Sequence, residues 1–436
     1  MEQRWTLHVE NFARIKEADI EISPLMCFVG DNNSGKSYMM SLLWGLLVSG
    51  EVLSENATQA LTTKKCEEWL SNNMGEPVDL NEDIQQMYID WFNELIELNK
   101  HSFIGHVFNQ DILIGKIEIR NFKRIRCFKI KIQNMSDRFE FSIIENGYKN
   151  IFIGLDIPKI NFLICWNLLM GNLGDFDPFR KSRVEPVYFP SSRTGLLLTY
   201  RQLAANAIET VYSQNSSKNS QEFLTLPYIK FLQKLNTLHQ GKQLYSDEVK
   251  ELIIFLERNL SNGNVRYLED SQAIRYQPDD IEQDIPLSIT SAVVTEISPF
   301  ILLLRNNMIP LMFVVDEPEA HLHPTLQKKI AQFIVRLMNY NTPVWITTHS
   351  DTILQHFNNM IKLKNHPDCK KLLEEFSYTQ DDLLGEDEIA LYQFKRKEHE
   401  TTIERLKSGK YGFVVPTFND ANEKLLDEIL AFQEDD

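Results

Sequence analysis

Apolar and polar residues alternate along the first 30 positions in a pattern that predicts three strands. The stretches WTLHVENF, ADIEI and LMCFVG are separated by polar breaks, and the last is apolar almost throughout. A short run that is apolar throughout is typical of a strand buried on both faces. Residues 37–50, SYMMSLLWGLLVSG, have the composition of a buried helix that ends near Gly50.

The middle of the chain alternates between helical and strand-like patterns. Residues 51–100 place large apolar side chains at helical spacing. Residues 116–133 alternate apolar and basic side chains with period two, and together with residues 137–155 they predict several antiparallel strands. After the strand-like run VYFPSSRTG, residues 200–260 predict a compact helical insert, which is broken by a polar loop at 213–220.

The second half of the chain contains two further apolar strands, LMFVVD and PVWITTH, on either side of the helical segment TLQKKIAQFIVRLMN. A hairpin pattern, NVRYLEDSQAIRYQ, and an apolar helix precede them. The strand–helix–strand order is typical of a parallel sheet with crossover helices. In the tail we expect the strand ALYQF, a polar segment with helical character, the short run FVVP and a final acidic amphipathic helix.

These elements predict an α/β fold with a mixed or parallel core sheet, an antiparallel β subdomain and a compact helical insert. The division into segments follows the changes of pattern along the chain. We expect an N-terminal lobe at 1–50, a helical insert at 51–115, antiparallel strands with a second core strand at 116–198, a helical insert with a hairpin at 199–284, a second core lobe at 285–360 and a C-terminal segment at 361–436.

Composition is that of a soluble globular protein, with 43% hydrophobic and 24% charged residues among 436. No apolar run approaches the ~20 residues that span a bilayer, and the N-terminus lacks the layout of a signal peptide. The five cysteines lie far apart without a C-x-x-C pair, so neither a disulfide framework nor a zinc site is indicated. We therefore expect a cytoplasmic protein without a membrane partner.

The formal charge of −16, from 45 basic and 61 acidic residues, disfavours non-specific binding to nucleic acid by the whole surface. One basic stretch interrupts this acidity and leaves two interpretations open: a solvated strand face, which is the commoner case, or a contact surface for nucleic acid or an acidic protein. It consists of Lys116, Arg120, Lys123, Arg124, Arg126, Lys129 and Lys131.

The octet GDNNSGKS at 30–37 matches the phosphate-loop pattern G-x-x-x-x-G-K-[ST] in full, between a predicted strand and a predicted helix. Gly30 and Gly35 let backbone N–H groups turn toward the α- and β-phosphates, and the N-terminus of the helix favours the anion. Lys36 is expected to contact the β- and γ-phosphates, and Ser37 to supply a hydroxyl to Mg²⁺. The remaining loop residues are Asp31, Asn32, Asn33 and Ser34.

A pair of carboxylates follows the strand LMFVVD, where ligands bind in parallel sheets. We expect Asp316 to hold the Mg²⁺ shell, and Glu317 to orient and deprotonate the attacking water. His349 ends the next strand, where a histidine can sense the γ-phosphate. A lone histidine at a strand end is more often structural, but its place after the phosphate loop and the acidic pair favours the sensing role.

Three other residues leave alternatives open. Arg193 in PSSRTG would either contact nucleotide or a neighbouring subunit, or form a structural salt bridge. The sequence favours neither of these two interpretations over the other. His321 and His323 lie two apart in a loop, where structural support of the loop is favoured over a metal site.

The order of three motifs resembles that of ABC-type ATPases of the RecF, SMC and OLD branch. These motifs are the phosphate loop with Asn32, then DEPEAHLHP, then TTHS. The resemblance covers residues 1–48 and 285–355. It implies an ABC-type P-loop ATPase head with ATP and Mg²⁺ as cofactors. It also implies a head-to-tail dimer, in which the signature motif of each subunit contacts the γ-phosphate bound by the other.

The segment ITSAV at 289–293 stands where that branch has its signature motif. Thr290 and Ser291 are the expected donors to the γ-phosphate of the second subunit. The branch usually has a serine–glycine pair here, whereas this chain has Ala292, whose Cβ restricts close approach of the backbone. We therefore expect ATP binding and leave the speed of hydrolysis open.

Residues 350–436 contain no convincing TOPRIM arrangement of acids, the chain shows no HNH cluster, and no heptads are sustained enough for long arms. The chain thus resembles the ATPase subunits of the bacterial anti-phage systems Septu, which some retrons also carry, and PARIS. The resemblance implies a homo-oligomer that regulates a separate HNH or TOPRIM nuclease, with a phage protein or nucleic acid as trigger.

Two other functions remain as alternatives. A RecF-like DNA-repair ATPase would bind DNA directly, which the acidic charge disfavours and the basic stretch favours. A small-molecule phosphotransferase would use the same phosphate loop, but DEPEAHLHP and ITSAV would have no role in it.

Overall fold

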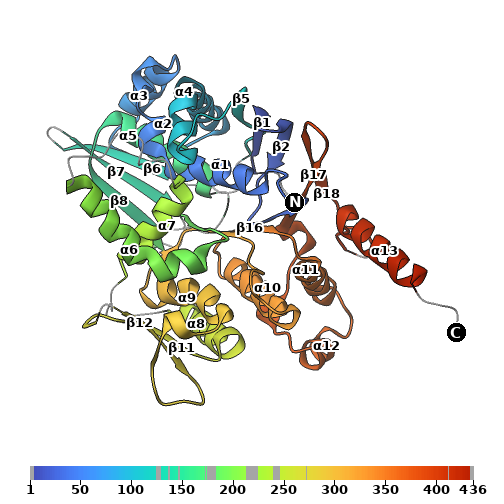
Figure 1. Cartoon of the computed structure of the whole chain (residues 1–436). Coiled ribbons are helices and arrows are strands. Elements are labelled where there is room, and N and C mark those ends of the chain that lie inside the picture. The colour runs from blue at the N-terminus through green and yellow to red at the C-terminus, as the bar shows by residue number, and fades with distance from the viewer. Residues whose placement is uncertain are drawn as a thin grey trace.

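One large sheet organises the molecule (Figure 1). The structure is a computed structural model that describes residues 4–123, 129–135, 138–145, 148–171, 173, 183–212, 224–238, 246–271, 273–410 and 412–432. The sheet has nine strands in the order β10-β15-β16-β3-β17-β18-β2-β1-β5. In that order they are Val187–Phe189, Phe313–Asp316, Val344–Thr348, Leu25–Gly30, Ile389–Arg396, Thr401–Leu406, Ile15–Glu21, Thr6–Phe12 and Lys116–Arg120.

The half of the sheet from β10 to β17 is parallel throughout. Strands β3, β15 and β16 are buried along their whole length. In β3, Met26 and Phe28 pack into one core, whereas Leu25, Cys27 and Val29 pack into the other. Burial on both faces explains why these strands are apolar without alternation. The predicted α/β class with a mixed core sheet is confirmed.

Helices cover both faces of the sheet and close the two cores. On one face the helices share a core with Met26 and Phe28, and on the other with Leu25 and Val29. The first group is α1 (Lys36–Val48), α4 (Glu82–Phe108) and α5 (Ile157–Gly171). The second group includes α9 (Ala292–Arg305), α10 (Pro324–Asn339) and α11 (Asp351–Lys364), with α12 (Cys369–Glu375) beyond them.

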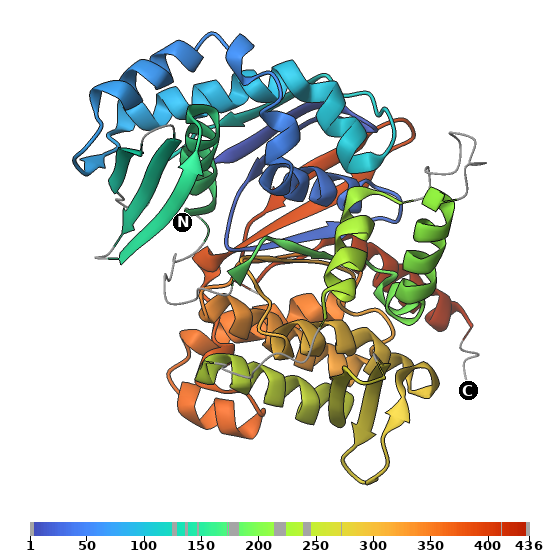
Figure 2. The same cartoon turned by 90° about the vertical axis from the view of Figure 1, so that its left-hand side faces the viewer.

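A smaller antiparallel sheet, β4-β6-β7-β8, lies beside the helices of residues 50–108 (Figure 2). The predicted antiparallel strands and first helical insert are thereby confirmed. Strand β5, which continues the same sequence pattern, pairs instead with β1 of the large sheet. The elements are β4 (Val78–Asp79), β6 (Lys129–Met135), β7 (Arg138–Glu145), β8 (Tyr148–Leu155), α2 (Gly50–Leu53) and α3 (Thr63–Asn72).

The second predicted helical region and the hairpin are also present. The polar loop predicted at 213–220 lies outside the described residues. The helices are α6 (Arg193–Tyr212), α7 (Leu226–Asn236) and α8 (Asp247–Leu256). The remaining strands are β11 (Gly263–Leu268), β12 (Ala273–Pro278) and β13 (Ile285–Pro286) in one sheet, and β9 (Arg183–Val184) with β14 (Ile309–Pro310) in another.

The tail contributes to the centre of the large sheet. The expected strand ALYQF is part of β17, which pairs in parallel with β3. The helical character expected for the polar segment that follows is wrong, because residues 401–406 form β18 and pair with β17. Pairing to an existing strand overrides local propensity here. The run FVVP forms no strand, and the acidic helix α13 (Pro416–Ala431) is confirmed.

Within the part of the chain that the structure describes, no helix combines the length and apolarity that crossing a membrane requires.

At Gly30 the backbone of β3 leaves no room for a side chain next to Phe394 of β17, and substitution of this glycine tests the packing. Its φ is 125°, and a Cβ there would lie 2.1 Å from the carbonyl oxygen of Phe394. We expect Gly30→Ala to lower the free energy of unfolding by about 3 kcal/mol, because it adds both a clash and backbone strain. Denaturant titration measures this change.

Gly105→Ala is the matched control, because Gly105 lies inside α4 and a Cβ added there would meet open space. This change should be neutral or stabilise the protein by up to about 1 kcal/mol. Equal stability of Gly30→Ala and wild type would contradict the described contact between β3 and β17.

Candidate nucleotide-binding site

The octet at 30–37 forms a tight loop between β3 and α1. Gly30, Asn33 and Gly35 have positive φ values of 125°, 57° and 94°. A loop of this kind turns backbone N–H groups inward, and α1 begins at Lys36, so its N-terminal dipole adds to the attraction of an anion. The strand–loop–helix context expected from the sequence is therefore present.

Lys36 lies at the centre of this loop with only 5% of its surface exposed. Its ammonium group donates to the carbonyl oxygens of Gly30 at 3.0 Å and Asp31 at 2.7 Å. Burial lowers the pKa of Lys36 to about 8, against the opposing effect of Glu317 and Asp31. The loop thus holds a desolvated cation that a phosphate group would stabilise.

Two other loop residues have roles that the pattern alone does not specify. The carboxylate of Asp31 accepts a hydrogen bond from the backbone N–H of Arg396 at 3.0 Å, and so attaches the loop to β17. The hydroxyl of Ser34 is buried and has no hydrogen-bond partner among the described residues. An unpartnered buried hydroxyl in an N–H-rich loop fits a phosphate oxygen as its partner.

Ser37 and Asp316 meet where the loop faces the end of β15. The hydroxyl of Ser37 donates to Asp316 Oδ1 at 3.3 Å, as does that of Thr347 at 2.7 Å, and Tyr188 donates to Oδ2 at 2.7 Å. Burial raises the pKa of Asp316, and these hydrogen bonds oppose the shift. A hydroxyl and a carboxylate beside a phosphate loop are the hard oxygen donors that Mg²⁺ prefers, so this donor set fits the expected ion.

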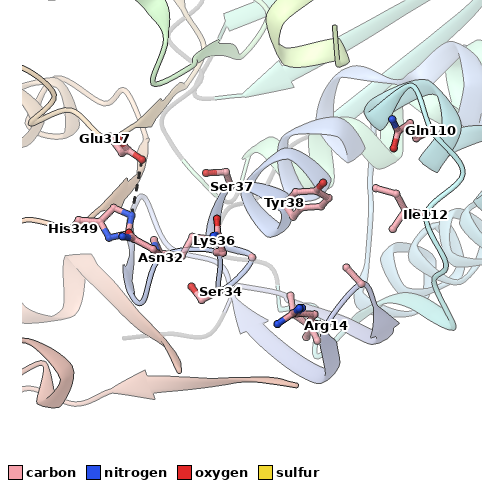
Figure 3. Close-up of a pocket in the computed structure, with 14 residues that line it drawn as sticks. Arg14, Asn32, Ser34, Lys36, Ser37, Tyr38, Gln110, Ile112, Glu317 and His349 are labelled. Atoms are coloured by element: carbon pink, nitrogen blue, oxygen red, sulfur yellow. Dashed lines mark ion pairs between the residues drawn. The ribbon is translucent and has the colours of Figure 1, made fainter. Parts of the chain in front are cut away.

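Glu317 and His349 face the loop from the ends of β15 and β16 (Figure 3). The Glu317 carboxylate is 41% exposed, and its Oε1 lies 3.9 Å from Nε2 of His349. Glu317 has a φ of 47°, which is uncommon for a residue with a side chain and directs it away from the buried strand. Burial and the nearby Lys36 lower the pKa of His349, so a neutral imidazole is favoured at neutral pH.

Glu319 is a site residue that the sequence motifs did not predict. One of its carboxylate oxygens accepts hydrogen bonds from the N–H of His349 at 2.7 Å and the hydroxyl of Thr348 at 2.8 Å. It therefore fixes the position of His349. The signal was the second glutamate of DEPE, which lies two residues after Glu317.

A cavity of 680 Å³ lies over the loop. Its lining includes Glu317 and His349 together with the predicted loop residues from Asn32 to Ser37. This volume is within the range of small-molecule and cofactor sites. The wall opposite His349 comes from segments that carried no motif, the β1–β2 turn with Arg14, the exposed Tyr38 of α1, and Gln110 with Ile112 after α4 (Figure 3).

The structure does not bring Thr290 and Ser291 into this cavity, because neither residue lines it. Ser291 caps α9 by accepting a hydrogen bond from the N–H of Val294 at 3.4 Å, and Thr290 donates to the carbonyl of Leu287 at 2.8 Å. Ser291 and Ala292 are exposed to solvent. The N-terminus of α9 is thus presented at the surface.

Arg193 is fully buried, and its structural interpretation is correct. Its guanidinium donates to the carbonyl oxygens of Asp316 at 2.8 Å and Glu317 at 3.1 Å, and its Nε lies 2.7 Å from Glu296 Oε2. Since Glu296 lies in α9, this side chain joins the acidic turn after β15 to the helix that begins at Ser291.

The two loop histidines have contacts of their own. His323 caps α10 by accepting a hydrogen bond from the N–H of Thr325 at 3.4 Å, and His321 Nε2 lies 3.8 Å from Glu296. Among the described residues, no group of three or more histidines, cysteines or carboxylates is arranged to hold a metal ion.

Two family models match separate parts of the chain. Residues 6–109, which contain the phosphate loop, match an AAA ATPase domain. Residues 212–355, which contain Asp316, Glu317 and His349, match a family described as AAA domain, putative AbiEii toxin, Type IV TA system. A comparison with curated proteins gave no match. Two separate parts of the chain are thus similar to AAA-type ATPase domains, and the loop at 30–37 has the geometry of a phosphate-binding loop.

Several solved structures align with most of the chain at low identity. A Smc head bound to the C-winged helix domain of ScpA has 12% identity, a TM-score of 0.38, and 92% of this chain and 97% of that chain covered. An SMC head domain from Thermotoga maritima has 10% identity, a TM-score of 0.35, and 93% and 100% covered. A Smc head domain with an extended coiled coil, bound to the C-terminal domain of ScpA derived from Pyrococcus furiosus, has 12% identity and a TM-score of 0.36, and 97% of this chain and 98% of that chain are covered.

The buried ammonium of Lys36 predicts how ATP affinity depends on pH. Because its pKa in the free protein is about 8, the group is charged below that pH and increasingly neutral above it. ATP prefers the charged form, so affinity should fall about twofold between pH 7 and 8 and then by up to about tenfold per pH unit. Isothermal titration calorimetry of ATP binding from pH 7 to 9.5 measures this profile.

Lys36→Ala should abolish measurable ATP binding at every pH, whereas Lys64→Ala, on the exposed side of α3, should keep the wild-type profile. Unchanged affinity in Lys36→Ala would exclude the loop as the phosphate site. If the ATP affinity of the wild type did not change with pH, the desolvated ammonium of Lys36 would be excluded as the charged contact of the phosphates.

Proposed function

We propose that this protein is an ATP-binding and ATP-hydrolysing subunit that works as a homo-oligomer, in which each nucleotide cavity is completed by Thr290 and Ser291 of a second copy. The observation that supports this most is the surface position of these residues. The N-terminus of α9 has an exposed serine and faces solvent, while the cavity of its own chain is lined without it. A helix N-terminus is a ready contact for the γ-phosphate of a nucleotide bound elsewhere.

Each residue of the cavity has a defined role in this proposal. The loop N–H groups, the Ser34 hydroxyl and Lys36 bind the phosphates, and Ser37 with Asp316 would hold Mg²⁺, which neutralises phosphate charge when bound. Glu317 accepts the proton of the attacking water, since its carboxylate is exposed to the cavity. Neutral His349 donates or accepts a hydrogen bond at the γ-phosphate.

We further propose that ATP sets the state of an anti-phage complex in which a separate nuclease, of HNH or TOPRIM type, is regulated. The support is the motif resemblance to the ATPase subunits of Septu and PARIS. The match of residues 212–355 to a family described by a toxin of a Type IV toxin–antitoxin system also favours a regulated toxic activity. A phage protein or nucleic acid would be the trigger, and the cytoplasm the place of action.

A RecF-like ATPase that binds DNA directly is the alternative, and the basic stretch is the observation in its favour. Several of its charges are compensated locally: Lys116 and Arg120 both contact Glu118 Oε2, at 2.8 and 2.6 Å. Lys129 lies 3.5 Å from Asp79. Arg124 and Arg126 lie outside the described residues. Paired side chains contribute less to phosphate binding, so this alternative is weaker.

Mixing two inactive variants tests the shared cavity. Lys36→Ala removes the loop cation but keeps α9, and Ser291→Arg blocks the N-terminus of α9 but keeps the loop. Each alone should lack ATPase activity. At a 1:1 ratio, random pairing makes half of the dimers mixed, each with one complete site, so about a quarter of wild-type activity should return. A steady-state phosphate-release assay measures it.

The control is a mixture of Lys36→Ala with Glu317→Gln, whose defects both lie in the cavity of their own chain. In that mixed dimer neither cavity is complete, so no activity should return. Absence of recovery with Ser291→Arg, despite mixed dimers detected by mass, would contradict the shared site.

Glu317→Gln also tests the general base. The amide keeps the shape of the side chain but accepts no proton, so turnover should fall at least about 100-fold while ATP affinity is retained. Bound ATP should then stabilise the dimer, which sedimentation velocity detects. Turnover near the wild-type rate would show that another group activates the water.

The biological proposal and its alternative differ in what the protein binds. Tight, ATP-dependent binding of the isolated protein to DNA in an electrophoretic shift assay favours the RecF-like function. Co-purification of a nuclease encoded beside this chain, with a defined mass ratio, favours the anti-phage complex.

A further inference from the structure

A second pocket, the basic pocket, is bounded by α10, α11 and the residues around α12. It has a volume of 330 Å³ and shares no lining residue with the nucleotide cavity. Its apolar walls come from Leu363, Leu372 and Phe376, and Phe376 is 53% exposed. Its basic residues are Lys328, His356, Lys362 and His366, and none of the described residues that line it is a carboxylate. On a chain with a formal charge of −16, such a pocket favours a ligand that is both acidic and apolar.

Tyr378 places a polarised aromatic ring in the wall of this pocket. The Lys328 ammonium lies 4.1 Å from the ring centroid and also donates to the carbonyl of Phe376. The Tyr378 hydroxyl lies 2.9 Å from Nδ1 of His356. Lys362 and His366 are exposed, and Nδ1 of His366 accepts a hydrogen bond from the N–H of Asp368 at 3.1 Å, which leaves its Nε2 for a bound carboxylate.

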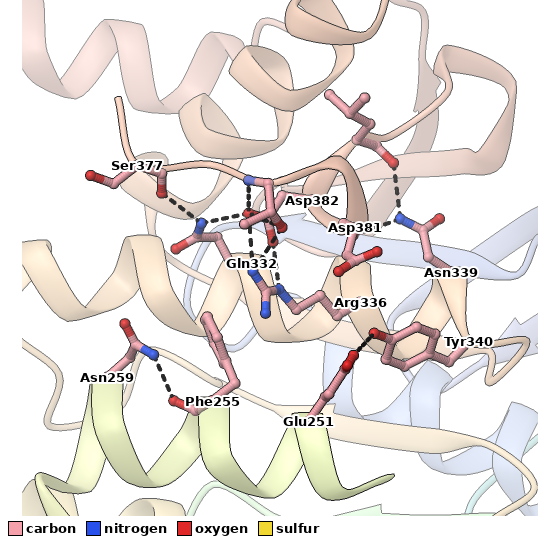
Figure 4. Close-up of polar contacts among 12 residues, drawn as sticks. Glu251, Phe255, Asn259, Gln332, Arg336, Asn339, Tyr340, Ser377, Asp381 and Asp382 are labelled. Atoms are coloured by element: carbon pink, nitrogen blue, oxygen red, sulfur yellow. Dashed lines mark hydrogen bonds and ion pairs between the residues drawn. The ribbon is translucent and has the colours of Figure 1, made fainter. Parts of the chain in front are cut away.

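A buried polar network holds the chain segment that carries Phe376 and Tyr378 against α10 (Figure 4). Gln332 donates to the carbonyl of Ser377 at 3.1 Å and to Asp382 Oδ2 at 2.8 Å. Arg336 Nε donates to Asp382 Oδ1 at 2.7 Å. Since Asp382 is fully buried and paired, the wall of the pocket is fixed before any ligand arrives.

The acidic helix α13 has the complementary surface. Its first turn is attached to the protein through Phe418, but residues 423–432 are exposed throughout, and the helix projects from the body (Figure 1). The carboxylates of Glu423, Asp427 and Glu428 outnumber Lys424. The large apolar side chains of its last turns and of the residue that follows it are 47–82% exposed, namely Leu425, Leu426, Ile429, Leu430 and Phe432.

The chain before α13 fixes where this helix starts. Asn358 of α11 accepts a hydrogen bond from the N–H of Phe413 at 2.7 Å and donates to its carbonyl at 2.8 Å. Its neighbour Asn359 lines the basic pocket. The chain that leads into α13 is therefore fixed to α11, while residues 423–432 stay exposed and can present their apolar face to another molecule.

We propose that α13 of one copy docks over the basic pocket of a second copy. An apolar side chain from the last turns of α13 enters the pocket, and its carboxylates contact Lys362 and His366. Charge complementarity favours this occupant over a pair of α13 helices, which would bring two acidic helices together. A two-fold axis would make the exchange reciprocal, so that two helices and two pockets contribute to one interface.

This contact does not depend on the nucleotide cavity, so its test uses the full chain with Lys36→Ala and without nucleotide. Lys362→Glu with His366→Glu, and separately Asp427→Lys with Glu428→Lys, should each weaken self-association at least about tenfold. Combining all four changes restores opposite charges and should recover association to within about threefold of the starting protein. Sedimentation velocity across a concentration series measures the dissociation constants.

Lys64→Glu, an exposed charge reversal on α3, is the control and should leave self-association unchanged. Leu426→Ser with Ile429→Ser tests the apolar part and should weaken association without rescue by the charge changes. Circular dichroism spectra matching wild type separate a lost contact from a lost fold. Failure of the four-fold variant to recover association would overturn the proposal.

Cross-linking identifies which chain holds the helix. Phe432→Cys with Phe376→Cys, in a Cys369→Ser background, should give a disulfide, and mixing isotopically light and heavy copies should show it between chains. A disulfide within one chain, a disulfide between two Phe432→Cys positions, or a monomer at all concentrations would each overturn the proposal. Association of α13 with a different polypeptide alone, and not with a second copy, would also overturn the proposal.

Discussion

The buried guanidinium of Arg193 is the interaction on which the geometry of the nucleotide site depends. It holds two successive carbonyl groups, those of Asp316 and Glu317, and its charge is balanced by Glu296. Burying this charge without its partners would cost several kcal/mol. The turn that directs Glu317 into the cavity is therefore stable only while α9 supplies the matching carboxylate. Thr194, next to Arg193, donates to the same carboxylate at 2.7 Å and reinforces the link.

This arrangement connects the N-terminal part of α9 to the turn after β15 through buried side chains. The helix that begins after Ser291 and the turn that bears Glu317 are joined through the ion pair of Arg193 with Glu296. A phosphate bound at Ser291 would act on the same helix that fixes Glu317. In the proposed oligomer, the occupancy of one cavity can therefore influence the catalytic group of the other through packing alone.

The sequence predicted those parts of the site that lie in one continuous stretch. The octet at 30–37 and the pair Asp316–Glu317 carry their chemistry in local spacing, and the structure places them together. Tyr188 and Thr347 were not predicted, because each reaches Asp316 through strand pairing, which local patterns do not record. The same reason explains the tail: β18 has a polar sequence and becomes a strand only because β17 is beside it.

The position of β17 has a consequence for the synthesis of the protein. The loop at 30–37 is made first, yet its first glycine packs against Phe394 and its aspartate is held by Arg396. A ribosome must therefore add more than 350 further residues before the loop can reach its final shape. Contacts this distant in sequence form late and slowly. A nascent or truncated chain would contain the nucleotide motif before the contacts that hold its loop to β17 can form.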